Sequence, residues 1–408
     1  MNARRQREAV AALIAQVQPA VRERIYAGDV IIEPSGGDDP PVLTDKQGRL
    51  LPGRVGAFAH DDGSAAGVYP RCTIVAGTSD LDRGGLMTSS IIRCCDTEGE
   101  QMRIGLFAGT TGGAPDVMSI VDDVKRAEDE GFATFSLANI FSHDAIGALT
   151  LAGAQTSRIE LLTNIVPTYP RHPLAMAQQA LTAQAVSGGR FTLGIGVSHQ
   201  VVIEGMLGLS YGRPARHMSE YLAVLMPLLH GDAVRHEGEQ YTLRGQLSVP
   251  DAAPVPCLLA AMAPVMLRLA GEVADGTTLW MTAVKTVEEH VAPRIRRAAA
   301  NVGRAEPRIV CGLPIALTTD PEAARAAAAE QFQNYGQLPS YRSMLDFEGA
   351  AGPADVAIIG DETALDQALD RLEASGVTEF VGAPFAADSE AVTRTRAYLA
   401  DRASRAAG

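Results

Sequence analysis

The sequence predicts an α/β fold: a (β/α)8 TIM barrel that begins near Met102, with insertions after strands 4 and 7, and an irregular extension before it. Two observations predict the barrel. Strand-like and helix-like segments alternate after Met102, as parallel βα units require, and the strand-like segments number eight, as a closed barrel of this kind needs. They lie near residues 103–107, 133–138, 159–165, 191–196, 256–261, 276–281, 308–317 and 378–383.

Helix boundaries between these strands have local causes. Asp116 is a typical N-cap residue and begins a helix that runs to Gly131. His172-Pro173 opens another helix, because the fixed φ of proline suits the first helical turn. Two connections are longer than a simple crossover, Gly205–Pro254 after the fourth strand and Gln333–Asp355 after the seventh, and long loops in such positions can shape a substrate mouth.

Residues 1–101 differ in character from the rest. An amphipathic helix is expected over Arg7–Ile25, and residues 33–85 are rich in Gly, Pro and Asp. Two interpretations compete: a small accessory domain or arm, and an upstream extension read through from an early start codon. We favour the second, because Met102 directly precedes the first barrel strand. The expected division is an extension over 1–101 and a barrel over 102–408.

Composition excludes several classes of protein. The net charge of −13 argues against a nucleic-acid surface, which needs a local excess of Lys and Arg. No apolar run reaches the roughly 18 residues of a membrane span, and the N-terminus does not resemble a signal peptide. The five cysteines are odd in number and form no CxxC pair, so we expect reduced thiols and no zinc ribbon. A cytoplasmic enzyme acting on a small molecule fits these features.

Candidate site residues lie at the carboxyl ends of the strands, where barrels of this kind carry their active sites. Gly194-x-Gly196 is not a dinucleotide fingerprint, because His199 replaces the third glycine. These glycines either relieve crowding or let the backbone approach a cofactor ring. Pro264 predicts a helix start whose free amides form an anion site. No metal-binding, serine-hydrolase or kinase motif occurs, so no metal is expected.

Three strings carry a resemblance to a known family: Thr168–Pro173 (TYPRHP), Ser187–Gly196 (SGGRFTLGIG) and Leu267–Gly276 (LRLAGEVADG). They resemble the luciferase-like monooxygenase superfamily, and within it the branch that uses the deazaflavin coenzyme F420. The similarity extends through residues 205–211, 213–217 and 335–341. It covers essentially all of 102–386 and none of 1–101.

The resemblance implies a set of cofactor contacts. In this superfamily the third strand holds a bulge, often with a non-proline cis peptide, that presses on the middle of the flavin-like ring. The corresponding residues here are Asn164 and Ile165. Contacts after the fourth strand fall on Val197 and Ser198, and the acidic position after the second strand falls on Asn139. The phosphate contacts fall on Met262, Ala263, Val265 and Met266.

Two departures from the family pattern bear on catalysis. Relatives often carry an Asp-His pair where this chain has Asn139-Ile140, so a general base is absent there. His199 stands where some relatives hold a carboxylate, and it is the acid/base candidate because its free pKa of about 6.5 suits proton transfer at neutral pH. The alternative is a histidine that only hydrogen-bonds cofactor or substrate. Trp280 either lines the substrate pocket or belongs to the core.

The resemblance therefore implies an F420-dependent oxidoreductase that transfers a hydride between the reduced deazaflavin and a small organic substrate. Methylene-tetrahydromethanopterin reductases are among such enzymes. One alternative is an FMN-dependent luciferase-like monooxygenase, and another is a barrel that binds a flavin without catalysis. Relatives are often homodimers, and the sequence itself neither supports nor excludes a dimer.

Overall fold

The computed structural model describes residues 30–33, 42–45, 72–73, 93–94, 101–110, 116–386 and 389–407. The chain divides into two compact units, 1–100 and 101–408. The described strands of the first unit form an antiparallel sheet in the order β2-β1-β3-β4, with bounds Val30–Glu33 (β1), Val42–Asp45 (β2), Cys72–Thr73 (β3) and Arg93–Cys94 (β4). The helix expected over Arg7–Ile25 lies outside the described residues.

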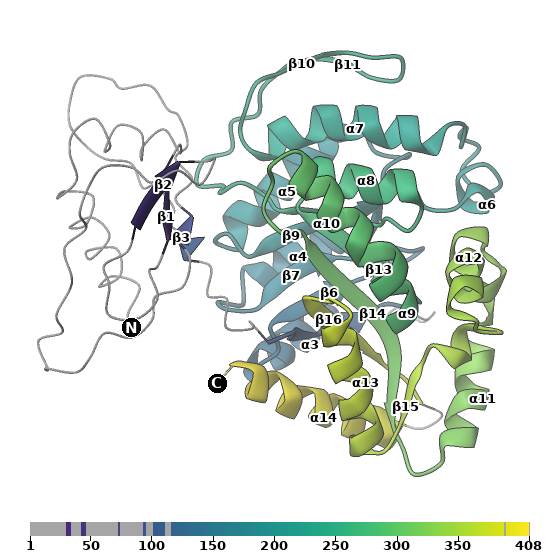
Figure 1. The fold of residues 1–408 in the computed structure, drawn as a ribbon. Coiled ribbons are helices and arrows are strands. Elements are labelled where there is room, and N and C mark those ends of the chain that lie inside the picture. Colours follow the sequence, from purple (N-terminus) through teal and green to yellow (C-terminus); the bar gives the residue numbers. More distant parts are fainter. Residues whose placement is uncertain are drawn as a thin grey trace, which may run out of the picture. The chain divides into compact units, whose positions relative to one another are not determined.

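Eight parallel strands of the second unit close into a barrel (Figure 1) in the order β12-β13-β14-β16-β5-β6-β7-β9. The ring is complete because Leu258 of β12 is the register partner of Gly276 in β13 and of Gly194 in β9. The (β/α)8 fold is thus confirmed. The strands are Arg103–Ala108 (β5), Thr134–Leu137 (β6), Glu160–Thr163 (β7), Phe191–Gly196 (β9), Cys257–Leu259 (β12), Gly276–Trp280 (β13), Arg308–Leu317 (β14) and Glu379–Pro384 (β16).

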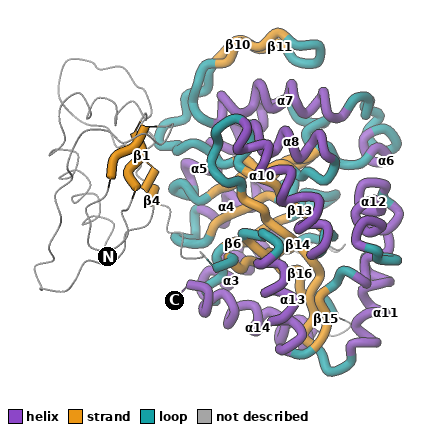
Figure 2. The backbone as a smooth tube through the Cα atoms, viewed as in Figure 1, coloured by secondary structure: helices purple, strands orange, loops and turns teal. Residues whose placement is uncertain are grey.

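Helices surround this barrel (Figure 2), and several of them begin at residues whose side chains explain the starts. The side chain of Asp116 accepts hydrogen bonds from the amides of Met118 and Ser119, and His172 caps the helix that opens with Pro173, as expected. The helices that follow the strands are Val117–Asp129 (α3), Ala145–Gly153 (α4), Pro173–Val186 (α5), Pro264–Glu272 (α8), Ala292–Asn301 (α10), Glu362–Ala374 (α13) and Ser389–Ala407 (α14). In the described part of the chain, no helix is long and apolar enough to cross a membrane.

The two long connections carry structure of their own. The first contains the helices Gln200–Ile203 (α6) and Pro214–Leu229 (α7) and a hairpin of Val234–Glu237 (β10) and Thr242–Gly245 (β11). The second lies between Pro321–Gln331 (α11) and Ile358–Gly360 (β15), and it contains Gln333–Gln337 (η2), Pro339–Glu348 (α12) and Pro353–Asp355 (η3). The strand β15 pairs with the extended end of β14, an addition that alternation alone did not predict.

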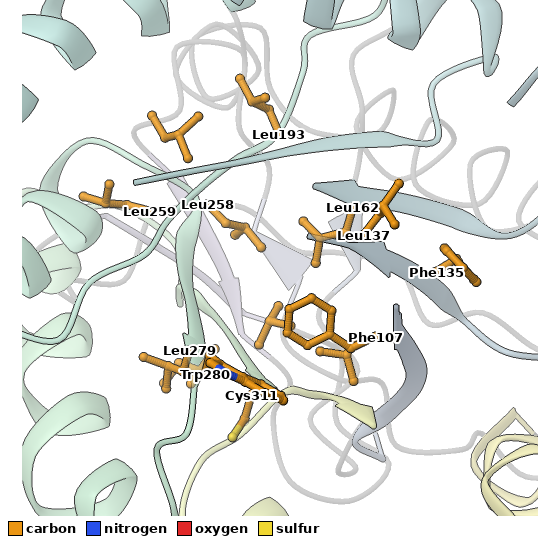
Figure 3. Packing of buried hydrophobic residues seen from close by; sticks show 14 of the residues in the cluster. Phe107, Phe135, Leu137, Leu162, Leu193, Leu258, Leu259, Leu279, Trp280 and Cys311 are labelled. Atoms are coloured by element: carbon orange, nitrogen blue, oxygen red, sulfur yellow. The ribbon is translucent and has the colours of Figure 1, made fainter. Parts of the chain in front are cut away.

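Apolar side chains fill the barrel and the layer beneath the helices. Figure 3 shows Phe107, Leu162, Leu258 and Trp280, each from a different strand, gathered in this cluster. Phe107 and Trp280 meet edge to face, with ring centroids 5.0 Å apart, and each is less than one-tenth exposed. Because Trp280 is the last residue of β13, this aromatic pair lies at the carboxyl end of the barrel strands.

Four charged side chains meet at the amino-terminal end of the barrel. Arg308 lies 2.8 Å from Glu160 and 2.7 Å from Glu379, and Arg103 lies 2.8 Å and 3.2 Å from the same two carboxylates. The strands β7 and β14 are not neighbours, so the Glu160–Arg308 pair crosses the interior. The charges balance, which is what burial of ions requires. This network closes the end opposite the candidate site.

Candidate active site

The segment between β7 and Val166–Pro167 (β8) lies at the carboxyl end of β7 and contains Asn164 and Ile165. The peptide bond between them is cis, as the resemblance led us to expect. Asn164 is buried, and its Oδ1 accepts a hydrogen bond of 2.9 Å from Oγ1 of Thr278 in β13. Its Nδ2 has no partner among the described residues. A buried donor of this kind costs about 1–3 kcal/mol until a ligand or water satisfies it.

The two glycines of β9 are required by close packing. A Cβ at Gly194 would lie 2.0 Å from the carbonyl oxygen of Thr163, and one at Gly196 would lie 2.9 Å from Cδ1 of Ile165. Crowding therefore explains both positions without a cofactor. The same contacts bring the cis peptide and the end of β9 against each other.

The helix α8 begins at the carboxyl end of β12 with amide groups free. Ala263 is its N-cap and has no side-chain acceptor to offer, and Pro264 occupies the first turn as predicted. The amide of Leu267 bonds to the Ala263 carbonyl, whereas the described residues provide no acceptor for the amides of Ala263, Val265 and Met266. Val265 is 47% exposed. Together with the helix dipole, these donors suit an anion.

His199 follows β9 and is the N-cap of α6. The preceding Ser198 has a φ of +58°, and its carbonyl accepts a hydrogen bond of 3.0 Å from the Tyr211 hydroxyl. The His199 ring lies 5.4 Å from the ring of Tyr341, and its Nδ1 is 3.5 Å from Oγ of Ser340. Burial lowers the pKa of His199 below its ordinary value. The imidazole is therefore neutral at pH 7 and can accept a proton.

Aromatic residues of the second long connection lie between His199 and the Phe107–Trp280 pair of the barrel. Tyr335 lies 5.8 Å from Trp280 and 5.4 Å from Tyr341, measured between ring centroids. The Tyr335 hydroxyl donates to the carbonyl of Thr110 after β5, at 3.1 Å. We call Phe107, Trp280, Tyr335 and Tyr341 the aromatic wall. It places an apolar, polarisable surface beside His199 at the carboxyl end of the strands.

The remaining predicted residues lie around the same end of the barrel. Asn139 follows β6, and its Oδ1 accepts a hydrogen bond from the amide of Ala145 at the start of α4, so this oxygen already holds the helix. Val197 is half-buried and packs on the core. The structure connects His199 with Trp280 through the aromatic wall, and Asn164 with β13. Among the described residues, no hydrogen bond or ring contact joins His199, Trp280 or Asn164 to Met262–Met266, whose cofactor role stays a prediction.

Sequence reasoning did not assign several residues at this end: Thr278, Tyr211, Tyr335, Ser340, Tyr341 and His290. Tyr335 and Tyr341 lie in a segment that carried part of the family resemblance, which was the one available signal. Thr278 precedes Trp280 by two residues in β13 and therefore faces the same side, so strand alternation could have found it. Nothing local marks His290, whose contact with Met262 spans 28 residues.

Comparison with known proteins identifies the family. The family model described as luciferase-like monooxygenase matches residues 102–393. The chain belongs to this family. The match spans nearly all of the barrel unit and leaves out the first hundred residues.

Two curated relatives illustrate how far the similarity reaches. A 5,10-methylenetetrahydromethanopterin reductase of Methanolobus tindarius is 29% identical over 216 residues, which cover 53% of this chain and 66% of the relative. A Mycobacterium tuberculosis protein, strain ATCC 25618 / H37Rv, is named for coenzyme F420-dependent oxidoreductase activity. It is 32% identical over 189 residues, which cover 43% of this chain and 54% of the relative. Both matches span less than two thirds of the relatives' own length.

Solved structures share the fold. The coenzyme F420-dependent tetrahydromethanopterin reductase of Methanopyrus kandleri superposes with a TM-score of 0.61 at 23% identity, over 74% of this chain and 97% of that one. The oxygenating constituent of 3,6-diketocamphane monooxygenase from Pseudomonas putida, in complex with FMN, gives a TM-score of 0.59 at 14% identity, over 75% and 98%. At these identities the likeness concerns the barrel alone.

The chemistry of the donor set fits a flavin-like cofactor. A flat heterocycle with a polar edge needs apolar walls and a few buried donors, and the aromatic wall and the free Nδ2 of Asn164 are groups of those kinds. A phosphate needs hydrogen-bond donors, which the first amides of α8 supply without a cationic side chain. The described residues hold no cluster of three His, Cys, Asp or Glu suited to a metal ion.

Proposed function

We propose that this protein is an F420-dependent oxidoreductase that transfers a hydride between the reduced deazaflavin and a small organic substrate. The observation that carries the proposal is the free, buried amide nitrogen of Asn164, whose oxygen bonds Thr278, two residues before Trp280 of the aromatic wall. Asn164 follows β7 at the carboxyl end of the barrel strands, where enzymes of this fold carry their active sites. Relatives named for F420 and for methylenetetrahydromethanopterin reduction support the choice of cofactor. We also expect a cytoplasmic protein, and a homodimer is a further proposal.

Each group of residues at the site would have its own role in binding or in proton transfer. Asn164 would bind the polar edge of the ring through Nδ2, with Oδ1 held by Thr278. The amides of Ala263 and Met266 would bind the phosphate. When bound, the reduced deazaflavin supplies a hydride to a carbon of the substrate. The aromatic wall would exclude water from the reacting carbon, and the neutral imidazole of His199 would hold or accept the substrate proton through Nε2, because Nδ1 faces Ser340.

Binding of the cofactor tests the first part. The purified protein is titrated with F420 and with FMN, and the absorbance and fluorescence of each are followed. We expect tighter binding of F420, and Asn164→Ala should weaken it by roughly 3- to 10-fold, the effect of about one hydrogen bond. Asn301→Ala, an exposed position on α10, is the matched control and should change nothing. Tighter binding of FMN would overturn the proposed cofactor.

Turnover of reduced F420 tests the role of His199. The acceptors are an activated alkene, an imine and 5,10-methylenetetrahydromethanopterin, and His230→Ala at the far end of α7 is the control. His199→Ala should lower the rate by about 100-fold or more, typical of a lost acid or base, with little change in cofactor affinity. Because the lowered pKa keeps the imidazole neutral at pH 7, the wild-type rate should fall only at acid pH. Equal losses in rate and affinity would assign His199 to binding.

A second candidate function has a specific observation in its favour. The FMN-bound monooxygenase from Pseudomonas putida has the same barrel at nearly the same TM-score as the F420-dependent reductase. The titration with both cofactors separates this candidate from the first. A barrel that binds a flavin without catalysis would bind in the titration and show no turnover with any acceptor.

A further inference from the structure

The helix α12 contacts the proposed site at one end and a different part of the barrel at the other. Its first residues, Ser340 and Tyr341, lie against His199. Its last residue, Glu348, reaches Val284–Thr286 (α9), the short helix that follows β13. The ten residues of α12 form one regular helix about 15 Å long, which joins these two contacts.

Glu348 binds the start of α9 through three hydrogen bonds. Its carboxylate accepts from the amides of Lys285 at 3.2 Å and Thr286 at 2.8 Å, and from the Thr286 hydroxyl at 2.7 Å. Thr286 is fully buried. Acceptance of first-turn amides by a carboxylate is the usual way to satisfy a helix start, but here the carboxylate comes from a different helix. This contact anchors α12 to α9.

Directly after α9 the chain forms a π-helical segment, Val287–Val291 (η1), that contains His290. His290 is buried, and its Nε2 donates to the carbonyl oxygen of Met262 at 2.7 Å. The ring of Phe347, the neighbour of Glu348 in α12, lies 5.5 Å from the His290 ring and 5.5 Å from Nζ of Lys285. His290 is therefore packed by the same turn of α12 that anchors α9.

The bond from His290 fixes the direction of the amide at the start of α8. The Met262–Ala263 peptide is trans, since the described residues contain one cis bond, at Asn164–Ile165. In a trans peptide the carbonyl and the N–H point in opposite directions. With the Met262 carbonyl turned to His290, the Ala263 N–H points away from η1, and it has no acceptor among the described residues.

We infer that His290 and Glu348 are positioning residues that link the cofactor's phosphate amides to the part of α12 that faces His199. His290 orients the Ala263 amide, and Glu348 holds η1 against α12. This inference rests on the proposed function for the identity of the anion, whereas the mechanical link itself rests on the contacts alone.

The test begins with the protein free of ligand, by hydrogen exchange of the Leu267 amide, which bonds to the Ala263 carbonyl in the first turn of α8. His290→Leu keeps the bulk and removes the donor, and His290→Gln keeps a donor. We expect exchange to rise about 10-fold or more in His290→Leu and to stay within about 2-fold of wild type in His290→Gln. Glu348→Gln should raise exchange at the same amide, while Glu288→Gln, on the exposed face of η1, should not. Unchanged exchange in either His290→Leu or Glu348→Gln overturns the link.

Titration with F420 is the second arm. His290→Leu should weaken binding about 10-fold, His290→Gln should restore it to within about 2-fold, and Glu348→Gln should lie between them. Wild-type affinity in His290→Leu would overturn the positioning role. If wild type binds neither F420 nor FMN, the proposed function fails, and exchange in the free protein still decides whether the link exists.

Discussion

Replacement of Glu379 by glutamine should destabilise the barrel measurably. The Glu379 side chain is 1% exposed and pairs with Arg308 and Arg103. Glu379→Gln preserves the shape but leaves two guanidinium groups facing the single carboxylate of Glu160. Loss of one partner from a buried ion pair costs about 3–5 kcal/mol. The two arginine side chains keep 26% and 34% exposure, so water offsets part of this cost and we expect about 2–4 kcal/mol.

Differential scanning calorimetry at neutral pH measures the effect. For a unit of roughly 300 residues the unfolding entropy is about 0.6 kcal/mol/K, so Glu379→Gln should lower Tm by about 3–6 °C. Glu390→Gln, an 84% exposed partner of Arg394, is the matched control and should shift Tm by less than about 1 °C. Adding Arg308→Gln restores the charge balance, so the double variant should lose less than the two single losses together. A shift below about 1 °C for Glu379→Gln would refute the reasoning.

Two further predictions concern the barrel. Burial raises the pKa of Glu160, but the guanidinium groups of Arg308 and Arg103 outweigh it and lower the pKa to about 2. Because the folded-state pKa lies below the unfolded value, this stabilisation is present above about pH 4.5 and is lost as the pH falls towards 2. The Tm of Glu160→Gln should therefore drop less between pH 4.5 and pH 2 than the Tm of wild type. Gly194→Ala places a methyl group against the Thr163 carbonyl and should cost about 3 kcal/mol or more, whereas Gly245→Ala, in open space, should cost under about 1; similar Tm values for the two would disprove the crowding argument.

Local signals in the sequence determined the architecture. The eight strands were found because each is a short apolar run followed by a helix, and periodicity of that kind is a property of neighbouring residues. Helix starts at Asp116, Pro173 and Pro264 followed from cap and proline chemistry, which acts over three or four residues. The cis bond at Asn164–Ile165 was expected from the family resemblance and not from any local pattern.

Only the tertiary structure decided which of these residues meet. Ser340 lies 141 positions from His199, and Asn164 lies 114 positions from Thr278, so no window of sequence contains either pair. The long connection after β14 was expected as a loop that could shape a substrate mouth, yet its helix α12 carries Tyr341 to His199 and Glu348 to α9. Such contacts arise because closure of the barrel brings the strand ends together and packs side chains from distant segments against one another. The sequence thus determined the order of strands and helices and the residues that begin the helices. Tertiary packing decided the aromatic wall and the contacts of His290 and Glu348.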